Sequence, residues 1–256
     1  MAKPRLDHLK RHAYLAGCFA RLLLLDPWSS SGRERLRDTA SDLKWGELSP
    51  GGRPASIEDL TPGSDDVRLI SLDYALFNTS FFELFVLTRL VRHACPQSVF
   101  EIGTFDGRST LNMALNTPDT TELLTFDLPP GHGTFGDRTE VGVRFRGHPL
   151  SSRITQLYGN TRYFDFTPYF GRCDFVFVDA DHSYESANFD TDTALKLLKP
   201  EGGILLWHDY SNFAGVQRAL DERMVEDPRF AGLTWIQGTT MALLEVGEVG
   251  VLGRAR

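Results

Sequence analysis

Two short groups of ionisable side chains each follow an apolar run, and their types suit acid–base or cation chemistry. Residues 175–178 are apolar and precede a D-A-D-H motif, and residues 204–207 are apolar and precede an H-D motif. Continuous apolar runs of this length predict buried parallel strands. The residues that follow such strands meet at one edge of the sheet, where open α/β sheets bind their ligands. Carboxylates and imidazoles gathered there can accept protons or bind divalent cations.

A second stretch, residues 98–127, would position a ligand beside these groups. It has the order strand, glycine turn, helix, strand and acid, and its turn runs G-T-F-D-G from Gly103. Glycines let the backbone approach a ligand closely, and the helix N-terminus offers amide groups to a negative group. A carboxylate at the end of the second strand, Asp127, can accept hydrogen bonds from a ribose diol. This order is typical of a nucleoside-binding half-sheet.

The glycine pattern distinguishes between nucleosides. A dinucleotide fingerprint that starts at Gly103 needs glycines at 105 and 108, where this chain has Phe105 and Arg108. The longer stretch F-E-I-G-T-F-D-G-R-S-T instead resembles motif I of class I S-adenosylmethionine-dependent methyltransferases, above all the small-molecule O-methyltransferases. The later series V-D-A-D-H-S-Y-E and L-K-P-E-G-G-I-L-L-W-H-D-Y resembles the same family. The resemblance covers about residues 78–245.

The resemblance implies S-adenosyl-L-methionine as the cofactor and a set of residues around it. These cofactor contacts are Glu101, Gly103, Thr104, Phe105, Gly107, Ser109, Asp127, Leu128, Asn160 and Asp179. Asn160 stands where the family contacts the adenine amino group, but it could equally cap a helix over residues 163–169. Thr79 and Ser80 could approach the methionine carboxylate or simply cap the helix that follows them.

The chemistry of the acceptor side has two open routes. Methyl transfer to a hydroxyl requires alignment of donor and acceptor and removal of the hydroxyl proton, by a general base or with a divalent metal. In metal-dependent relatives the ligands correspond to Asp179, His208 and Asp209 of this chain. Histidine stands there in place of an oxygen ligand, which either shifts preference from Mg²⁺ toward Mn²⁺, Fe²⁺ or Zn²⁺ or leaves His208 free as a base.

We favour His208 as the general base, with Asp179 or Asp181 orienting it or the acceptor. The remaining polar residues of the two motifs have structural alternatives. His182 could cap the helix that follows it, and Asp209 could cap the next helix or an intervening turn.

The order of elements predicts an α/β fold with a Rossmann-like, doubly wound sheet. The resemblance implies seven strands in the order 3-2-1-4-5-7-6, and residues 233–237 and 241–246 predict the closing antiparallel hairpin. We divide the chain into an N-terminal extension, residues 1–70, and an S-adenosylmethionine-binding domain, residues 71–256.

Three segments outside the sheet have open roles. Residues 5–25 predict an amphipathic helix with a basic face, which could be solvated, form a homodimer contact or meet an anionic acceptor. Residues 29–67 are interrupted by Ser, Gly and Pro and could be a lid, an acceptor wall or an unimportant arm. Residues 128–149 contain five glycines and predict a mobile cover over the adenosyl end of the site.

The amino-acid composition limits the classes of partner that we expect for this protein. A net charge of −7 argues against general nucleic-acid binding, which relies on Lys and Arg to neutralise phosphates. Cys18, Cys95 and Cys173 are far apart, which suits a reducing cytoplasm and argues against a disulfide framework or a thiolate zinc site. No apolar run reaches the ~18 residues of a membrane span. We therefore expect a cytoplasmic protein with a small-molecule acceptor and no membrane or nucleic-acid partner.

The sequence thus favours an S-adenosylmethionine-dependent methyltransferase that acts on a hydroxyl of a small molecule. One alternative is a non-catalytic protein that binds S-adenosylmethionine or S-adenosylhomocysteine. Another is a nicotinamide-dependent oxidoreductase, against which the two missing glycines count.

Overall fold

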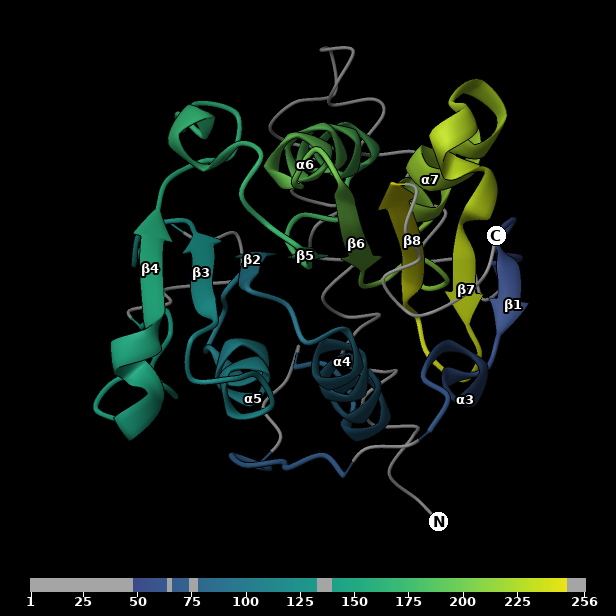
Figure 1. Cartoon of the computed structure of the whole chain (residues 1–256). Coiled ribbons are helices and arrows are strands. Elements are labelled where there is room, and N and C mark those ends of the chain that lie inside the picture. Colours follow the sequence, from purple (N-terminus) through teal and green to yellow (C-terminus); the bar gives the residue numbers. More distant parts are fainter. Residues whose placement is uncertain (1–47, 64–65, 74–77, 133–139, 248–256) are drawn as a thin grey trace, which may run out of the picture.

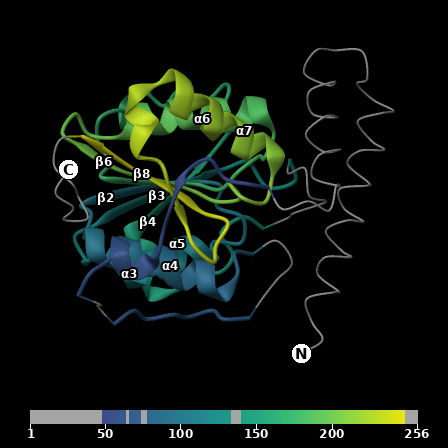
Figure 2. The same cartoon turned by 90° about the vertical axis from the view of Figure 1, so that its right-hand side faces the viewer.

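The protein is built as a sheet between two helical layers. The structure, a computed structural model, describes residues 48–63, 66–73, 78–132 and 140–247. One layer contains α3 (Ile57–Leu60), α4 (Phe81–Ala94) and α5 (Arg108–Leu115), and the other α6 (Tyr184–Leu197) and α7 (Ala214–Glu226) (Figures 1 and 2). The helix predicted over residues 5–25, with its dimer contact, lies outside the described residues. Within them, no helix has the length and hydropathy to span a membrane.

In the described part of the chain eight strands form the sheet, in the order β1-β7-β8-β6-β5-β2-β3-β4. Their bounds are Arg53–Ala55 (β1), Ser98–Ile102 (β2), Glu122–Asp127 (β3), Ile154–Tyr158 (β4), Phe175–Val178 (β5), Gly202–Trp207 (β6), Thr234–Ile236 (β7) and Ala242–Gly247 (β8). Among these described strands, β8 runs antiparallel to its neighbours β6 and β7, and the other pairs are parallel. The predicted seven-strand arrangement, with its C-terminal hairpin, is therefore present inside this sheet, and the predicted count of seven is wrong by one strand.

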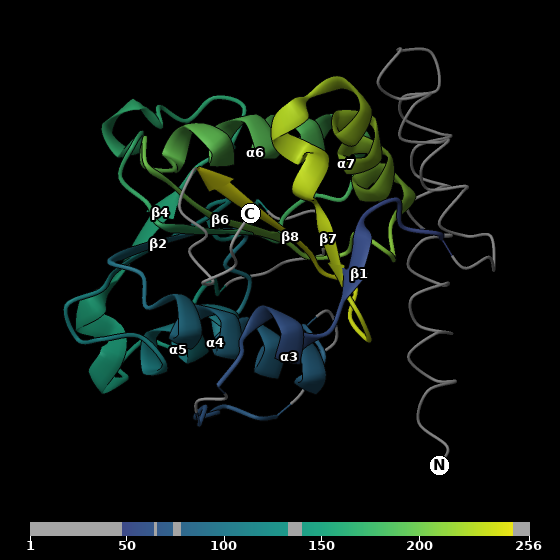
Figure 3. The same ribbon diagram turned by 45° about the vertical axis from the view of Figure 1, so that its right-hand side comes forward.

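The additional strand is β1, which pairs in parallel with β7 at the sheet edge (Figure 3). Its three residues include a proline and show no apolar alternation, so local sequence gives no strand signal. A tertiary contact anchors it instead. The amide of Gly52 donates to the hydroxyl of Tyr210 at 2.8 Å, and that hydroxyl donates to Asp221. Part of the predicted N-terminal extension is thus built into the sheet.

The central strands β2 and β5 are buried along their whole length, which is why their sequences are apolar on both faces. Ser98 and Glu101 in β2 are the exceptions, and Glu101 is the one that carries an ionisable group and has no exposed surface. Its Oε2 accepts hydrogen bonds from the hydroxyls of Thr110 and Thr125. Burial nevertheless raises the pKa of Glu101 to about 8. A protonated carboxylic acid therefore lies within the centre of the sheet at neutral pH.

This burial predicts a pH dependence of stability. The pKa of Glu101 is about 8 in the folded chain against an ordinary 4.5, so the folded state holds the extra proton between these values. Its contribution to the free energy of unfolding then falls as pH rises, by up to about 1.4 kcal/mol per pH unit. Glu101→Gln mimics the protonated acid. It should reduce the pH dependence of the free energy of unfolding, measured with urea, between pH 5 and about 8. Glu226→Gln, on the exposed face of α7, should leave the slope unchanged; equal slopes in all three proteins would contradict the assignment.

Candidate active site

The glycine turn after β2 approaches the loop after β5 closely. Gly103 has φ +107°, and a Cβ atom on it would lie 1.9 Å from the carbonyl oxygen of Asp179. The amide of Asp179 donates to the carbonyl of Ile102 at 2.8 Å. Glycine alone combines this backbone conformation with so close a contact. The turn and the D-A-D-H motif therefore meet at one point of the sheet edge.

Asp127 holds the turn in place. Its two carboxylate oxygens accept hydrogen bonds from the amides of Phe105 and Leu128, each at 2.7 Å. Because a carboxylate oxygen can accept more than one hydrogen bond, these two contacts are compatible with a further donor from a ligand. Gly107 precedes α5 as its N-cap, and Ser109 lies half-buried in the first turn of that helix. Most of the predicted cofactor contacts are thus brought together.

Two predicted cofactor contacts, Glu101 and Thr104, point into the fold instead. Thr104 is 2% exposed, and its hydroxyl lies 2.6 Å from that of Thr125. The side-chain amide of Gln156 in β4 donates to the hydroxyl of Thr104 at 3.0 Å. These residues support the turn from beneath, which corrects the expectation that they line the ligand surface.

Asn160 behaves as a local cap. Its Oδ1 accepts from the amide of Arg162 at 3.0 Å. The helix expected over residues 163–169 does not form; the segment contains turns and a three-residue 3₁₀ helix, Thr167–Tyr169. Pro168 lacks an amide and interrupts the hydrogen-bond series that an α-helix would need. The helix that Asn160 was expected to cap is therefore absent, and its side chain closes a turn instead. Its contact with adenine stays a prediction.

The loop that follows Asp127 folds back onto the glycine turn. Within its described part, the amide of Gly142 donates to the carbonyl of Phe105 at 2.9 Å. Val141 and Phe145 are buried, and the ring of Phe145 packs beside Gly107. Residues 141–148 form turns and bends. This half of the predicted cover thus has apolar anchors that sequence inspection underestimated.

Arg144 fastens the same loop to two other segments. Its guanidinium donates to Asp106 of the turn at 2.7 Å, and to Ser71 and Asp73 at 2.6 and 2.7 Å. Burial alone would lower the pKa of Arg144, but the two carboxylates raise it. A single side chain therefore joins the loop, the glycine turn and residues 66–73.

His208 lies at the centre of the second part of the site. Its Nδ1 is 3.2 Å from Asp179 Oδ1 and 3.1 Å from Asp209 Oδ2, and its Nε2 is 3.4 Å from Glu83 Oε2. These distances fit ion pairs. Neither buried ring nitrogen, however, makes a hydrogen bond of normal direction to a described residue. Of the four residues expected to meet at this edge, Asp179, Asp181, His208 and Asp209, the structure brings Asp179, His208 and Asp209 together.

Glu83 belongs to this cluster and was missed by the sequence interpretation. It is the third residue of α4 and forms a capping box with Ser80. Its Oε1 accepts from the amide and hydroxyl of Thr240, at 2.9 and 2.7 Å, in the turn between β7 and β8. The S-x-x-E spacing identifies a helix start in the sequence, but it does not reveal that the same carboxylate faces His208.

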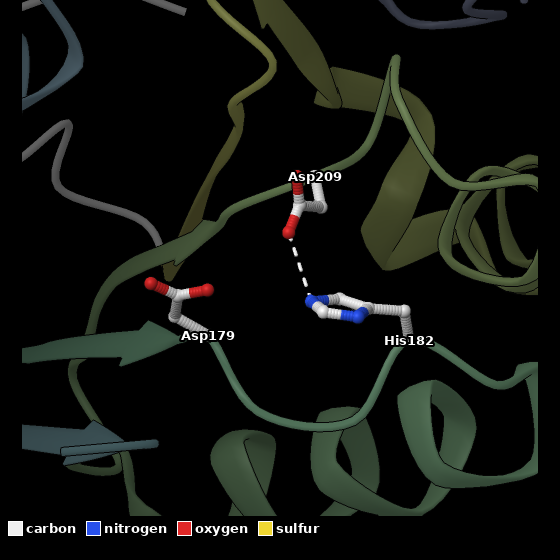
Figure 4. Close-up of side chains that lie close together, drawn as sticks. All are labelled: Asp179, His182 and Asp209. Carbon is white, nitrogen blue, oxygen red and sulfur yellow. Dashed lines mark ion pairs between the residues drawn. The ribbon is translucent and has the colours of Figure 1, made fainter. Parts of the chain in front are cut away.

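His182 also belongs to the cluster. Its Nε2 is 2.9 Å from Asp209 Oδ2 (Figure 4), and its ring stacks on Phe213 with centroids 4.1 Å apart. The cap of α6 is Ser183, whose hydroxyl accepts from the amide of Ser186. The capping alternative for His182 is therefore wrong.

Asp181, predicted to assist catalysis, faces the start of α6 instead. Its carboxylate accepts hydrogen bonds from the amide and hydroxyl of Ser183 and from the hydroxyl of Ser186. Among the described contacts it does not pair with His208. Both aspartates lie beyond the end of β5 in irregular backbone, so the rule that residues i and i+2 share one face of a strand does not apply to them.

The charges of the cluster are strongly coupled. Burial alone would lower the pKa of His208, but the carboxylates of Asp209, Asp179 and Glu83 raise it well above its ordinary value of 6.5. Burial alone would raise the pKa of Asp209, but His208 and His182 hold it well below its usual range. His208 is then protonated at neutral pH and has no lone pair with which to accept a proton. The role of His208 as general base stays a prediction, and it requires that the imidazole first lose the proton that these carboxylates stabilise.

Asp209 is also held in an unusual backbone conformation, with φ +63°. Its side chain accepts from the Asn212 side-chain amide at 2.9 Å, whereas the N-cap residue of α7 is Phe213, which gives no side-chain cap. Asp209 thus braces the turn without capping the helix. Left-handed conformation at a residue other than glycine costs about 1 kcal/mol or more, and such strain is common at functional sites.

Residues 100–210 match the model of a family described as "Methyltransferase domain", a segment that includes the glycine turn and both polar motifs. No curated protein is significantly similar to the sequence.

Solved structures identify the class of fold. The SAH-bound methyltransferase PaMTH1 from Podospora anserina is 20% identical, with a TM-score of 0.53 over 67% of this chain and 80% of that chain. Cofactor-bound Rv0187 from MTB is 21% identical, with a TM-score of 0.54 over 70% and 86%. An O-methyltransferase from Bacillus cereus in complex with SAH is 20% identical, with a TM-score of 0.50 over 70% and 84%. The chain therefore has the Rossmann-like fold of methyltransferases.

The Arg144 contacts predict local coupling between the loop and the turn. Arg144→Gln removes the guanidinium that joins Asp106 and Asp73. The hydrogen bonds of the backbone amides at Gly142 and around residue 144 should then open more often. Amide hydrogen exchange over residues 104–107 and 141–145 should then increase several-fold. Arg172→Gln, which breaks an exposed pair with Glu122, is the matched control. Unchanged protection in the first variant would show that Phe145 alone holds the loop.

Proposed function

We propose that the protein is an S-adenosylmethionine-dependent methyltransferase that methylates a hydroxyl group of a small molecule. The observation that carries this proposal is the position of Asp179. Its backbone touches Gly103 of the nucleoside-binding turn, and its carboxylate lies 3.2 Å from His208. Donor and acceptor sites would then meet at the carboxyl ends of β2, β5 and β6, as in-line methyl transfer requires.

The cofactor assignment is supported from two directions. The matched domain model and the SAH-bound neighbours with the same fold favour S-adenosylmethionine. Arg108, at the position where a dinucleotide fingerprint needs its last glycine, is 1% exposed and donates to the carbonyls of Ser71 and Thr79. A buried arginine there is incompatible with the close helix–strand packing that this glycine provides, which counts against a nicotinamide cofactor.

The acceptor side contains charge suited to handling a hydroxyl. Asp209 and Glu83 have pKa values lowered by His208, so both are ionised at neutral pH. Asp179 is the most exposed of the three carboxylates and lies nearest to the turn. In the proposal it orients the acceptor hydroxyl, while the buried residues fix its position. A small acceptor without nucleic-acid or membrane contacts is consistent with the acidic composition.

Mass spectrometry and a transfer assay test the function. Native mass spectrometry of the purified protein should detect S-adenosylmethionine or S-adenosylhomocysteine, and a nicotinamide cofactor would overturn the proposal. Incubation with methyl-labelled S-adenosylmethionine and a panel of phenols, catechols and sugar alcohols should give labelled product. Tight cofactor binding with no transfer to any hydroxyl, amine or carboxyl compound would favour a non-catalytic binding protein.

The ribose contact gives a quantitative prediction. Asp127→Ala should weaken S-adenosylhomocysteine binding by roughly 1.5–3 kcal/mol, the scale of a hydrogen bond to a charged group. Because Asp127 also holds the turn, Asp127→Asn, which keeps the size and one acceptor oxygen, should lose less. Calorimetry measures both, with the exposed Asp119→Ala as control. Full affinity in Asp127→Ala would refute the ribose assignment.

A further inference from the structure

We propose that Tyr210 is a positioning residue for Asp209, and that it acts through a latch formed by the Tyr210 hydroxyl, Asp221 of α7 and the two glycines Gly51 and Gly52 before β1. The proposal rests on the proposed function for the role of Asp209 at the acceptor side. It connects the edge of the sheet at β1 with the polar cluster of the site.

The first observation is the hydrogen bonding of the Tyr210 hydroxyl. The side chain has no exposed surface. Its hydroxyl accepts from the amide of Gly52 at 2.8 Å and donates to Asp221. The same carboxylate oxygen of Asp221 accepts from the amide of Gly51 at 3.2 Å. Since a phenol oxygen both donates and accepts, this one group joins the chain before β1 to α7 (Figure 3).

The second observation is the close fit of the two glycines against these partners. A Cβ atom on Gly51 would lie 2.9 Å from Asp221 Oδ1, and one on Gly52 would lie 3.3 Å from the hydroxyl oxygen of Tyr210. A side chain at position 51 would therefore displace the carboxylate that accepts both hydrogen bonds. Glycine allows the backbone to approach this closely. The end of the segment 29–67, whose role the sequence left open, thus has a specific contact with the core.

The third observation is the backbone at the other end of Tyr210. Asp209 has φ +63°, and a residue other than glycine keeps such a conformation only where the surrounding structure fixes it. The amide of Tyr210 donates to the carbonyl of Thr240 at 2.7 Å, and the amide of Asp209 donates to the hydroxyl of Thr240 at 3.2 Å. These bonds hold the backbone on the side of the β7–β8 turn. The anchored ring of Tyr210 holds it on the side of α7 and β1.

The conformation of Asp209 matters because its carboxylate serves two imidazoles. Its Oδ2 lies 2.9 Å from Nε2 of His182 (Figure 4) and 3.1 Å from Nδ1 of His208. Without the latch, the ring of Tyr210 could shift and Asp209 could relax toward the negative φ that is ordinary for residues other than glycine. Both imidazoles would then lose the alignment of a shared partner. Tyr210 therefore acts on the site through Asp209, without a place in it.

Magnetic resonance of isotope-labelled histidine tests the positioning role without an acceptor. Tyr210→Phe keeps the ring but removes both hydrogen bonds of the hydroxyl. At neutral pH the imidazole signals of His182 and His208, assigned with His182→Gln and His208→Gln, should move. Amide hydrogen exchange over residues 52–55 should increase several-fold, because the latch no longer holds β1. Asp221→Ala removes the acceptor from the α7 side and should have the same two effects.

Tyr184→Phe is the matched control. The Tyr184 hydroxyl also donates to a carboxylate of α7, that of Glu222, but this contact is exposed and joins α6 to α7. The His208 signal and the exchange over residues 52–55 should therefore match the wild type in this variant.

Turnover supplies the second readout. The hydroxyl compound of the panel that the wild-type protein methylates fastest is used as acceptor. Tyr210→Phe should lower kcat about 10- to 100-fold, the scale for a misplaced group, while calorimetry shows unchanged affinity for S-adenosylhomocysteine. A purely structural role of Tyr210 would instead lower cofactor affinity and thermal stability together with kcat.

Three results would decide against the proposal or against the function on which it rests. Faster exchange over residues 52–55 with unchanged imidazole signals would show that the latch holds β1 alone, and would overturn the positioning role. Wild-type signals and turnover in folded Tyr210→Phe would do the same, and Asp221→Ala carries the comparison if Tyr210→Phe does not fold. A wild-type protein that neither binds S-adenosylhomocysteine nor transfers methyl groups would refute the proposed function. The imidazole signals would then still decide whether Tyr210 positions Asp209.

Discussion

The contact between Gly103 and the backbone of Asp179 is the constraint on which the rest of the site depends. A side chain at position 103 would collide with the carbonyl of residue 179 at 1.9 Å, and the strands β2 and β5 could no longer end side by side. This contact places the glycine turn against the first carboxylate of the D-A-D-H motif. The position of Asp179 then decides where His208 must lie, because β5 and β6 are neighbours in register. Two motifs about 75 residues apart thus form one site through a single missing Cβ atom.

The polar cluster is costly to bury, and its own geometry offsets the cost. An isolated ionised carboxylate in the interior is strongly unfavourable, and so is an unpaired imidazolium. Here His208 stands among Glu83, Asp179 and Asp209, so each charge lies within 3.4 Å of an opposite one. Removal of one partner would leave the others uncompensated, as is typical of buried ion pairs. A contribution to folding stability therefore does not explain the cluster, which is one physical reason to regard it as functional.

The sequence predicted those parts of the molecule that local patterns control. The apolar runs over residues 175–178 and 204–207 predicted the buried strands β5 and β6, and the meeting of the residues that follow them came from parallel-sheet rules. It missed β1 because Tyr210 and the edge of β7, rather than its own three residues, hold that strand in the sheet. It also placed Glu101 at the ligand surface, although a strand interior buried on both faces points such a side chain into the core.

Glu83 shows most clearly why part of the site could not be found in the sequence. A glutamate three residues after Ser80 has a sufficient local explanation as a capping box, so nothing in the sequence calls for a second role. The two oxygens of the carboxylate divide between tasks: Oε2 serves the helix cap and faces His208, while Oε1 binds Thr240 of the β7–β8 turn. The helix start, the hairpin and the imidazole are therefore positioned by one side chain. Because His208 directly follows β6, a movement of α4 relative to the hairpin would change the distance between the Glu83 carboxylate and the imidazole. The residue that caps α4 therefore also sets the charge environment of His208.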